Sequence, residues 1–93
     1  MEAIQDRTKA LLTRAEGSLK DLIDELKSAK QGKLPADVLK QAQALHRKAQ
    51  WRVDFVLAEN SLGFHAPQES ARILGEAIDF ARQGELKLLR QAK

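Results

Sequence analysis

Apolar residues recur at steps of three and four along this 93-residue chain, and two breaks divide the pattern into three segments. Glycine and proline interrupt it in "QGKLPAD", residues 31–37, and in "SLGFHAPQ", residues 61–68. The intervening segments are rich in Ala, Leu, Lys, Glu, Gln and Arg, which have high helix propensity. The pattern therefore predicts helices over about residues 2–30, 35–60 and 67–91.

Each predicted helix has one apolar face, and the short connections between the helices favour antiparallel neighbours. We therefore predict an all-α fold, an antiparallel up-down-up three-helix bundle with long helices, in which residues 1–93 form a single domain. Gly84 interrupts the third face, so we expect the last turns to fray or to be staggered. The predicted face positions are Ile4, Leu11, Leu12, Ala15, Leu19, Leu22, Ile23, Leu26 and Ala29; Val38, Leu39, Ala42, Leu45, Ala49, Val53, Val56 and Leu57; and Ala71, Ile73, Leu74, Ala77, Ile78, Ala81, Leu88 and Leu89.

Composition excludes several kinds of site. The chain has no cysteine, which excludes disulfides, thiolate metal sites and thiol nucleophiles. Its two histidines are too few for a histidine-rich zinc site.

No apolar run approaches the roughly 20 residues that span a bilayer. The polar start "MEAIQDRTK" is not a signal peptide, so this chain alone is expected to stay in the cytosol.

The charge pattern gives little support to nucleic-acid binding. The net charge is +3, and 16 basic residues are interleaved with 13 acidic ones. The most basic stretch is "HRKAQWR", residues 46–52, but its cations do not all project from one side of a helix. Recognition of nucleic acid needs a concentrated basic face, so we expect none; a DNA-binding helical protein stays the weakest alternative.

Asp21, Asp24 and Glu25 form an acidic cluster in the first predicted helix. Nothing in the sequence indicates that they are buried, so we interpret them as a solvated face with Lys20 and Lys27 as partners. We predict no catalytic residue in this chain.

Trp51 and Phe55 stand four residues apart, on a side of the second helix adjoining its apolar face. The second helix thus has more apolar surface than one neighbour needs, which indicates a partner surface. One hypothesis from the residues alone is therefore a helical protein-interaction module without a redox role.

His65 lies at the second break, two residues before Pro67. By the residues alone, a turn residue is favoured over a metal ligand. A neutral imidazole is a common metal ligand, but a single one does not hold a metal by itself.

A resemblance to a known family favours the ligand role of His65 over the role of a turn residue. The strings "AQWRVDF", "AENSLGFHAPQE" and "ARILGEAID", within residues 46–81, resemble the C-terminal helical region of ammonia-forming, pentahaem cytochrome c nitrite reductases. "IQDRTKALLTRAEGSLKDLIDELKSA" is similar to the long helix that follows the last haem-binding motif of that family.

The resemblance implies that His65 matches a distal axial ligand of one haem c. It also implies a periplasmic or extracytoplasmic parent enzyme, a haem-bearing remainder of the same polypeptide as partner, and a homodimer formed through the long helices. All C-x-x-C-H motifs are absent, so we expect an inactive C-terminal fragment of an oxidoreductase, with no cofactor of its own and with His65 exposed and unliganded.

Overall fold

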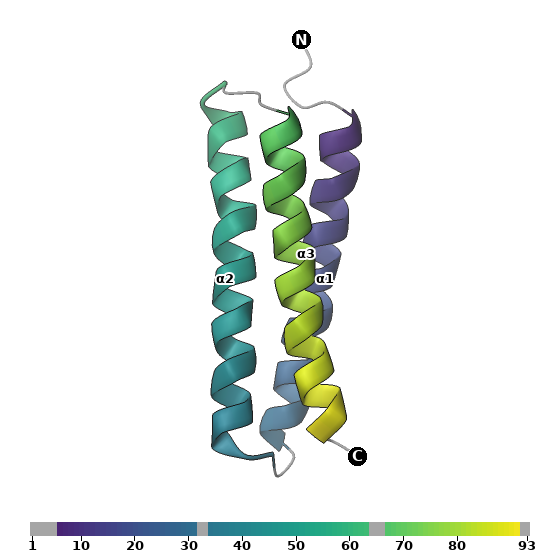
Figure 1. Ribbon diagram of the computed structural model, residues 1–93, viewed down its shortest axis with the longest axis vertical. Coiled ribbons are helices and arrows are strands. Elements are labelled where there is room, and N and C mark those ends of the chain that lie inside the picture. The colour runs from purple at the N-terminus through teal and green to yellow at the C-terminus, as the bar shows by residue number, and fades with distance from the viewer. Residues whose placement is uncertain (1–5, 32–33, 64–66, 92–93) are drawn as a thin grey trace.

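The computed structural model describes residues 6–31, 34–63 and 67–91, and these residues form three α-helices (Figure 1). They are α1 (Asp6–Gln31), α2 (Ala36–Ser61) and α3 (Pro67–Gln91). The helices run up, down and up in a bundle with extents of 50 × 18 × 17 Å. The predicted all-α, antiparallel three-helix bundle is confirmed, while the expected helical residues 2–5 lie outside the described residues.

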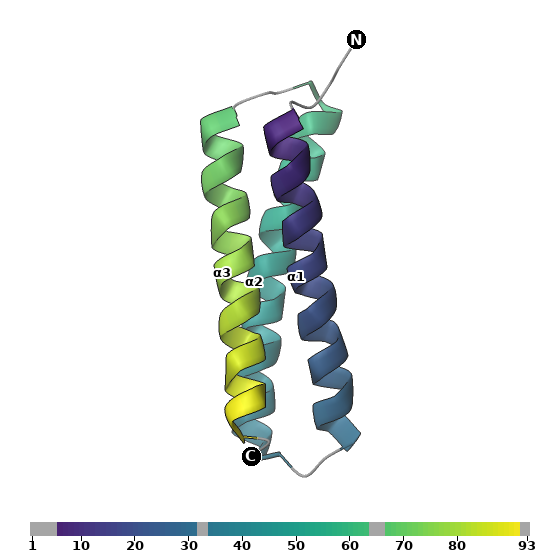
Figure 2. The same cartoon turned by 90° about the vertical axis from the view of Figure 1, so that its right-hand side faces the viewer.

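α3 packs against both other helices, whereas α1 and α2 contact each other less (Figures 1 and 2). The C-terminal end of α2, the beginning of α3 and the beginning of α1 lie together at one end of the bundle. The end of α1, the beginning of α2 and the end of α3 lie at the other.

The core is made of the apolar faces that the sequence predicts. Most of the predicted positions are buried. The prediction is wrong for Leu57 and Leu89, which are exposed on the surface. Leu22, Leu74, Leu88, Val53 and Val56 are the largest side chains that are fully enclosed. The buried apolar residues are Leu12, Ala15, Leu19, Leu22, Leu26, Ala29, Ala42, Ala49, Val53, Val56, Ile73, Leu74, Ala77, Ala81 and Leu88.

The two ends of α2 are formed differently. Pro35 stands just before the helix with φ −58°, and its carbonyl accepts a bond of 3.2 Å from Leu39 N–H. At the other end, the N–H of Gly63 donates to the Asn60 carbonyl at 3.1 Å, and Gly63 has φ 85°. A residue with a Cβ is strained at this left-handed angle, so glycine suits the end of the helix.

The helix α3 does not fray after Gly84, since it is helical as far as Gln91. A Cβ placed on Gly84 would lie 3.1 Å from both terminal carbons of Leu22 and 3.5 Å from Leu45 Cβ. The expected fraying of the last turns is therefore wrong, because Gly84 is buried where all three helices approach one another.

Candidate functional site

Trp51 and Phe55 form an aromatic pair on α2. Their spacing of four residues brings the rings together on the helix surface, with centroids 5.3 Å apart and an interplanar angle of 15°. Phe55 packs partly against the core, but Trp51 remains 61% exposed. Trp51 is thus an interface candidate rather than a core residue.

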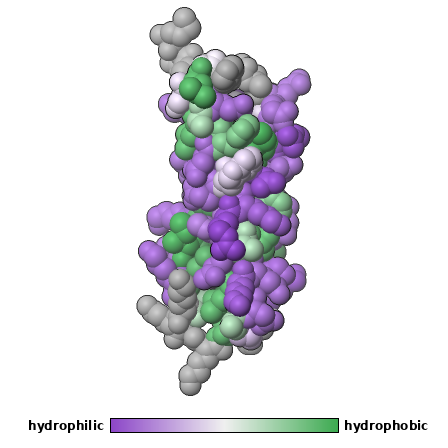
Figure 3. All heavy atoms as spheres, turned by 90° about the vertical axis from the view of Figure 1, so that its left-hand side faces the viewer, coloured by the Kyte–Doolittle hydropathy of each residue, from purple (hydrophilic) through white to green (hydrophobic). Residues whose placement is uncertain are grey.

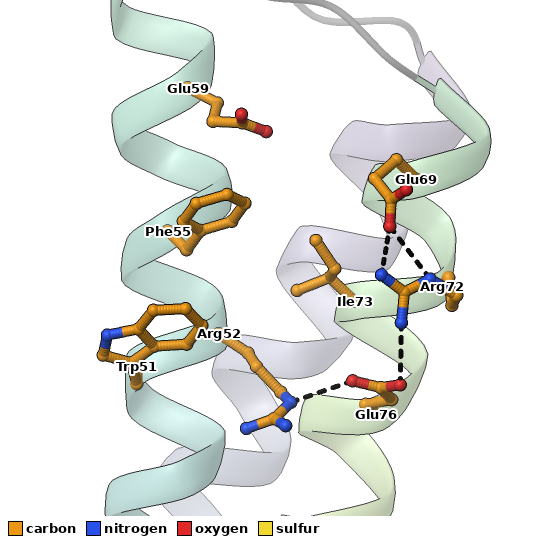
Figure 4. Close-up of a pocket in the computed structure, with 8 residues that line it drawn as sticks. All are labelled: Trp51, Arg52, Phe55, Glu59, Glu69, Arg72, Ile73 and Glu76. Carbon is orange, nitrogen blue, oxygen red and sulfur yellow. Dashed lines mark hydrogen bonds and ion pairs between the residues drawn. The ribbon is translucent and has the colours of Figure 1, made fainter.

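A groove of about 340 Å³ lies between α2 and α3 beside this pair (Figure 4). The α2 wall presents the two rings and the Glu59 carboxylate, and Ile73 lies on the α3 side. Charged side chains from α3 form the rest of that wall. The complete lining is Trp51, Arg52, Phe55, Glu59, Glu69, Arg72, Ile73 and Glu76.

One ion pair links the two walls of the groove, and two more lie within α3. Arg52 Nε donates to Glu76 Oε1 at 2.9 Å, and Arg72 Nη1 donates to Glu76 Oε2 at 3.0 Å. Arg72 also pairs with Glu69. The hydrogen bond from Arg52 is the main cause of the lowered pKa of Glu76, and the bond to Glu69 is the main cause of the raised pKa of Arg72. Both arginines of the groove are therefore held by carboxylates.

Arg52 has a second contact that the sequence reasoning missed. Its guanidinium carbon lies 4.6 Å from the centre of the Phe80 ring, and Lys48 Nζ lies 5.5 Å from the same centre. Arg52 therefore stacks on an aromatic ring while it pairs with Glu76. Two cations of the basic stretch 46–52 are thus directed toward α3.

The face of the molecule that α2 presents has separate hydrophobic areas with a hydrophilic band between them (Figure 3). The surplus apolar surface predicted for α2 is therefore confined to patches. Within the described residues, no helix combines the length and apolar character needed to cross a membrane.

The two histidines differ in position. His65 lies outside the described residues, so its predicted role as a ligand stays a prediction. His46 is half-buried in α2, and its Nε2 is enclosed without a hydrogen-bond partner among the described residues. Burial, and secondarily the charge of Arg47, lowers the pKa of His46. Since α2 rises about 1.5 Å per residue, His46 lies about 22 Å along the helix from Ser61.

Asp21 and Asp24 of the acidic cluster are exposed and paired, as predicted, whereas Glu25 is half-buried and the predicted partner Lys27 forms no ion pair with another described residue. Lys20 Nζ lies 3.4 Å from Asp24 Oδ2, and Arg82 Nη1 lies 3.0 Å from Asp21 Oδ2. Over residues 6–31, 34–63 and 67–91, no group of three His, Cys, Asp or Glu side chains is placed to hold a metal ion. The cluster therefore offers no metal centre.

Comparison with known proteins assigns the family. The cytochrome c552 profile matches residues 1–93. The chain belongs to the cytochrome c552 family. It is 39% identical to cytochrome c-552 of Parabacteroides distasonis, and to that of Bacteroides thetaiotaomicron, over 82 residues in each case. These residues are 88% of this chain and 17% of each relative. A cytochrome c-552 of Aliarcobacter butzleri is 50% identical over 42 residues, 45% of the chain and 8% of the relative. No solved structure matches.

The family assignment corrects the resemblance drawn from the sequence. The matched family and its relatives bear the name cytochrome c552, so the assignment to the C-terminal domain of pentahaem nitrite reductases is wrong. The string "AQWRVDF" falls in α2 and "ARILGEAID" in α3, and each contributes core residues, such as Val53 and Ile73.

The name of the family, cytochrome c552, indicates a haem as the cofactor of its members. The described residues do not fit a covalently attached haem by themselves, because the sequence has no cysteine to form thioether bonds. The chain spans 17% of the length of the Parabacteroides and Bacteroides relatives. These 93 residues therefore supply no cysteine for covalent haem attachment.

Proposed function

We propose that this chain is a helical packing element of a haem-binding cytochrome of the c552 family, and that it performs no catalysis alone. The observation that best supports this role is the 61% exposure of Trp51 beside an open groove, in a chain without cysteine. A large aromatic side chain that is packed on one neighbour and otherwise exposed is typical of a surface that another protein segment covers.

We further propose that His65 supplies a distal axial ligand to a haem c carried by another part of the polypeptide. His65 follows the last turn of α2 and precedes Pro67 in sequence, and these helix ends lie at the same end of the bundle (Figure 1). His46 is the other histidine, and its enclosed Nε2 is unsuited to an external iron. An axial imidazole is one of the means by which a protein sets a haem's potential.

Under this proposal the partner is the haem-bearing remainder of the same polypeptide, and the long helices also provide a surface for a homodimer. The location is then periplasmic or otherwise extracytoplasmic, where c-type cytochromes accept their haems. The proposal includes no nucleic-acid partner, because Arg52 of the basic stretch is already paired with Glu76.

The ligand assignment is tested by substitution in the longer cytochrome that contains this segment. His65→Ala is expected to convert one low-spin haem to a high-spin or differently ligated form, seen in the visible spectrum and by electron paramagnetic resonance. His46→Gln is the matched control and is expected to leave every haem unchanged. An unaltered spectrum and redox titration in His65→Ala would remove His65 as a ligand.

A second candidate is a helical interaction module without a redox role, which the exposed Trp51, stacked on the half-buried Phe55, also supports. The two candidates differ in whether His65→Ala changes a haem. Sedimentation of the isolated chain adds a separate test, because a strict monomer counts against an intrinsic dimer surface.

A further inference from the structure

Three side chains form a stripe along the groove face of α2. Trp51, Phe55 and Glu59 follow one another at intervals of four residues, or about 6 Å along the helix. Figure 4 shows the Phe55 ring and the Glu59 carboxylate directed toward the space between α2 and α3, with the Trp51 ring lying along α2 beside Phe55. The stripe therefore offers aromatic surface with a carboxylate directly beyond it.

The charges of the groove are unbalanced. Its lining contains three carboxylates, Glu59, Glu69 and Glu76, but only two guanidinium groups, Arg52 and Arg72. Glu69 and Glu76 share these two cations. Glu59 has no ion pair with any other described residue. The groove thus has one negative charge in excess, located next to the aromatic pair.

A complete version of the same arrangement stands at the edge of this groove, where Arg52 and Glu76 line it. The Arg52 guanidinium lies 4.6 Å from the Phe80 ring centre and donates at 2.9 Å to Glu76. In that arrangement one guanidinium is held by a ring face and a carboxylate together. The Trp51–Phe55–Glu59 stripe has the ring surface and the carboxylate, and it lacks the cation.

The chemistry of the stripe favours arginine over lysine as the missing group. A guanidinium is flat and weakly hydrated, so one of its faces can stack on a ring while its edge donates to a carboxylate. An ammonium is a strongly hydrated point charge without such a face. The groove, at about 340 Å³, is within the size range of pockets that hold small groups, roughly 300–1,000 Å³.

We propose that the α2–α3 groove binds an arginine side chain of the protein surface that covers it, with the guanidinium stacked on the Trp51–Phe55 pair and hydrogen-bonded to Glu59. This inference deepens the packing role proposed above and depends on it for the identity of the partner, namely the haem-bearing remainder of the polypeptide. The recognition chemistry itself is a property of the 93-residue chain.

The test uses the isolated chain and two probes of equal shape. N-acetyl-arginine amide carries the cation, and N-acetyl-citrulline amide is its neutral counterpart. Trp51 is the only tryptophan, so the NMR shift of its indole N–H reports on the groove. The arginine probe is expected to give a saturable shift and to bind about fivefold more tightly than citrulline, in keeping with an exposed cation–π contact and ion pair.

Glu59→Gln is expected to weaken the arginine probe about threefold to fivefold, because it removes the ion pair and keeps the shape. Glu16→Gln, at an exposed position on α1, is the matched control and is expected to leave binding unchanged. The absence of a saturable shift, equal binding of the two probes, or equal binding to the two variants would overturn the proposal.

These outcomes are separate from those of the packing and ligand proposal. No haem is present in the probe experiment, so its failure leaves the His65 substitution test as it stands. An unchanged haem in His65→Ala together with a selective arginine response would instead remove the ligand role and keep the arginine site.

Discussion

The same two helices, α2 and α3, meet in opposite ways at two places. Near the α1–α2 connection, Gly84 lets the backbone of α3 approach so closely that an added Cβ would lie 3.5 Å from Leu45 Cβ. Near the α2–α3 connection, the helices leave a groove of about 340 Å³ lined by rings and ion pairs. The first place is built for stability, and the second leaves chemical groups available to a partner.

This comparison separates residues that hold the bundle together from residues that serve a partner. Substitutions at the close approach should lower the free energy of unfolding and leave partner binding to the folded fraction unchanged. Substitutions in the groove should weaken partner binding and leave the free energy of unfolding nearly unchanged.

Leu22→Ala is expected to have the largest effect. The Leu22 side chain is fully buried and contacts Gly84 at the close approach, so its truncation should reduce the free energy of unfolding by about 2–5 kcal/mol. Urea denaturation followed by circular dichroism measures this. Leu86→Ala, at an exposed leucine of the same helix as Gly84, is the control and should stay within about 0.5 kcal/mol of the wild type.

Gly84→Val is expected to follow, with a loss of about 1–3 kcal/mol from overpacking, because the new side chain would overlap the ends of Leu22. Gly75→Val is its control, since no heavy atom lies within 4 Å of a Cβ placed there. If the two variants had the same midpoint of denaturation, the close approach at Gly84 would not be the constraint described.

Replacing two further glycines by alanine should change the stability of the protein in opposite directions. Gly63→Ala should destabilise the protein by about 1 kcal/mol, because φ 85° strains a residue with a Cβ. Gly17→Ala lies within α1 with open space around the added carbon, and it should stabilise the protein by about 0.5–1 kcal/mol. Thermal denaturation of both variants in parallel checks the signs.

Acidification should weaken the bundle through His46, although by a smaller amount. Because burial lowers the pKa of the folded-state imidazole, the unfolded chain binds the proton more tightly, and stability falls as the pH drops from about 7 through the lowered pKa. Denaturation midpoints at several pH values between about 7.5 and 5 should show this decline. His46→Gln should flatten the profile over that window, and an unchanged slope would contradict the role of His46.

Much of the bundle could be predicted from the sequence, because helical packing follows a local period. Val53, Val56 and Leu74 stand at the steps of three and four that place them in the core, and they are buried. Gly84 was misjudged, since its effect depends on Leu22 and Leu45, which are distant in sequence.

The groove was predictable only in part. The spacings of Glu69, Arg72 and Glu76 allow ion pairs within one helix, and the Trp51–Phe55 spacing allows stacking. The link from Arg52 to Glu76 joins residues 24 positions apart, and only the folded hairpin brings them together. The specific enzyme resemblance was overturned by the family match over residues 1–93, and no contact in the fold bears on it.

The central claim is that the Trp51 side of the α2–α3 groove faces the remainder of the cytochrome. Hydroxyl-radical footprinting tests it most directly, by comparing side-chain oxidation in the isolated chain with oxidation of the same segment in the longer protein. Trp51 should be oxidised several-fold more slowly in the longer protein, while Leu86 near the other end of α3 should keep its rate. Equal oxidation of Trp51 in both proteins would contradict the account.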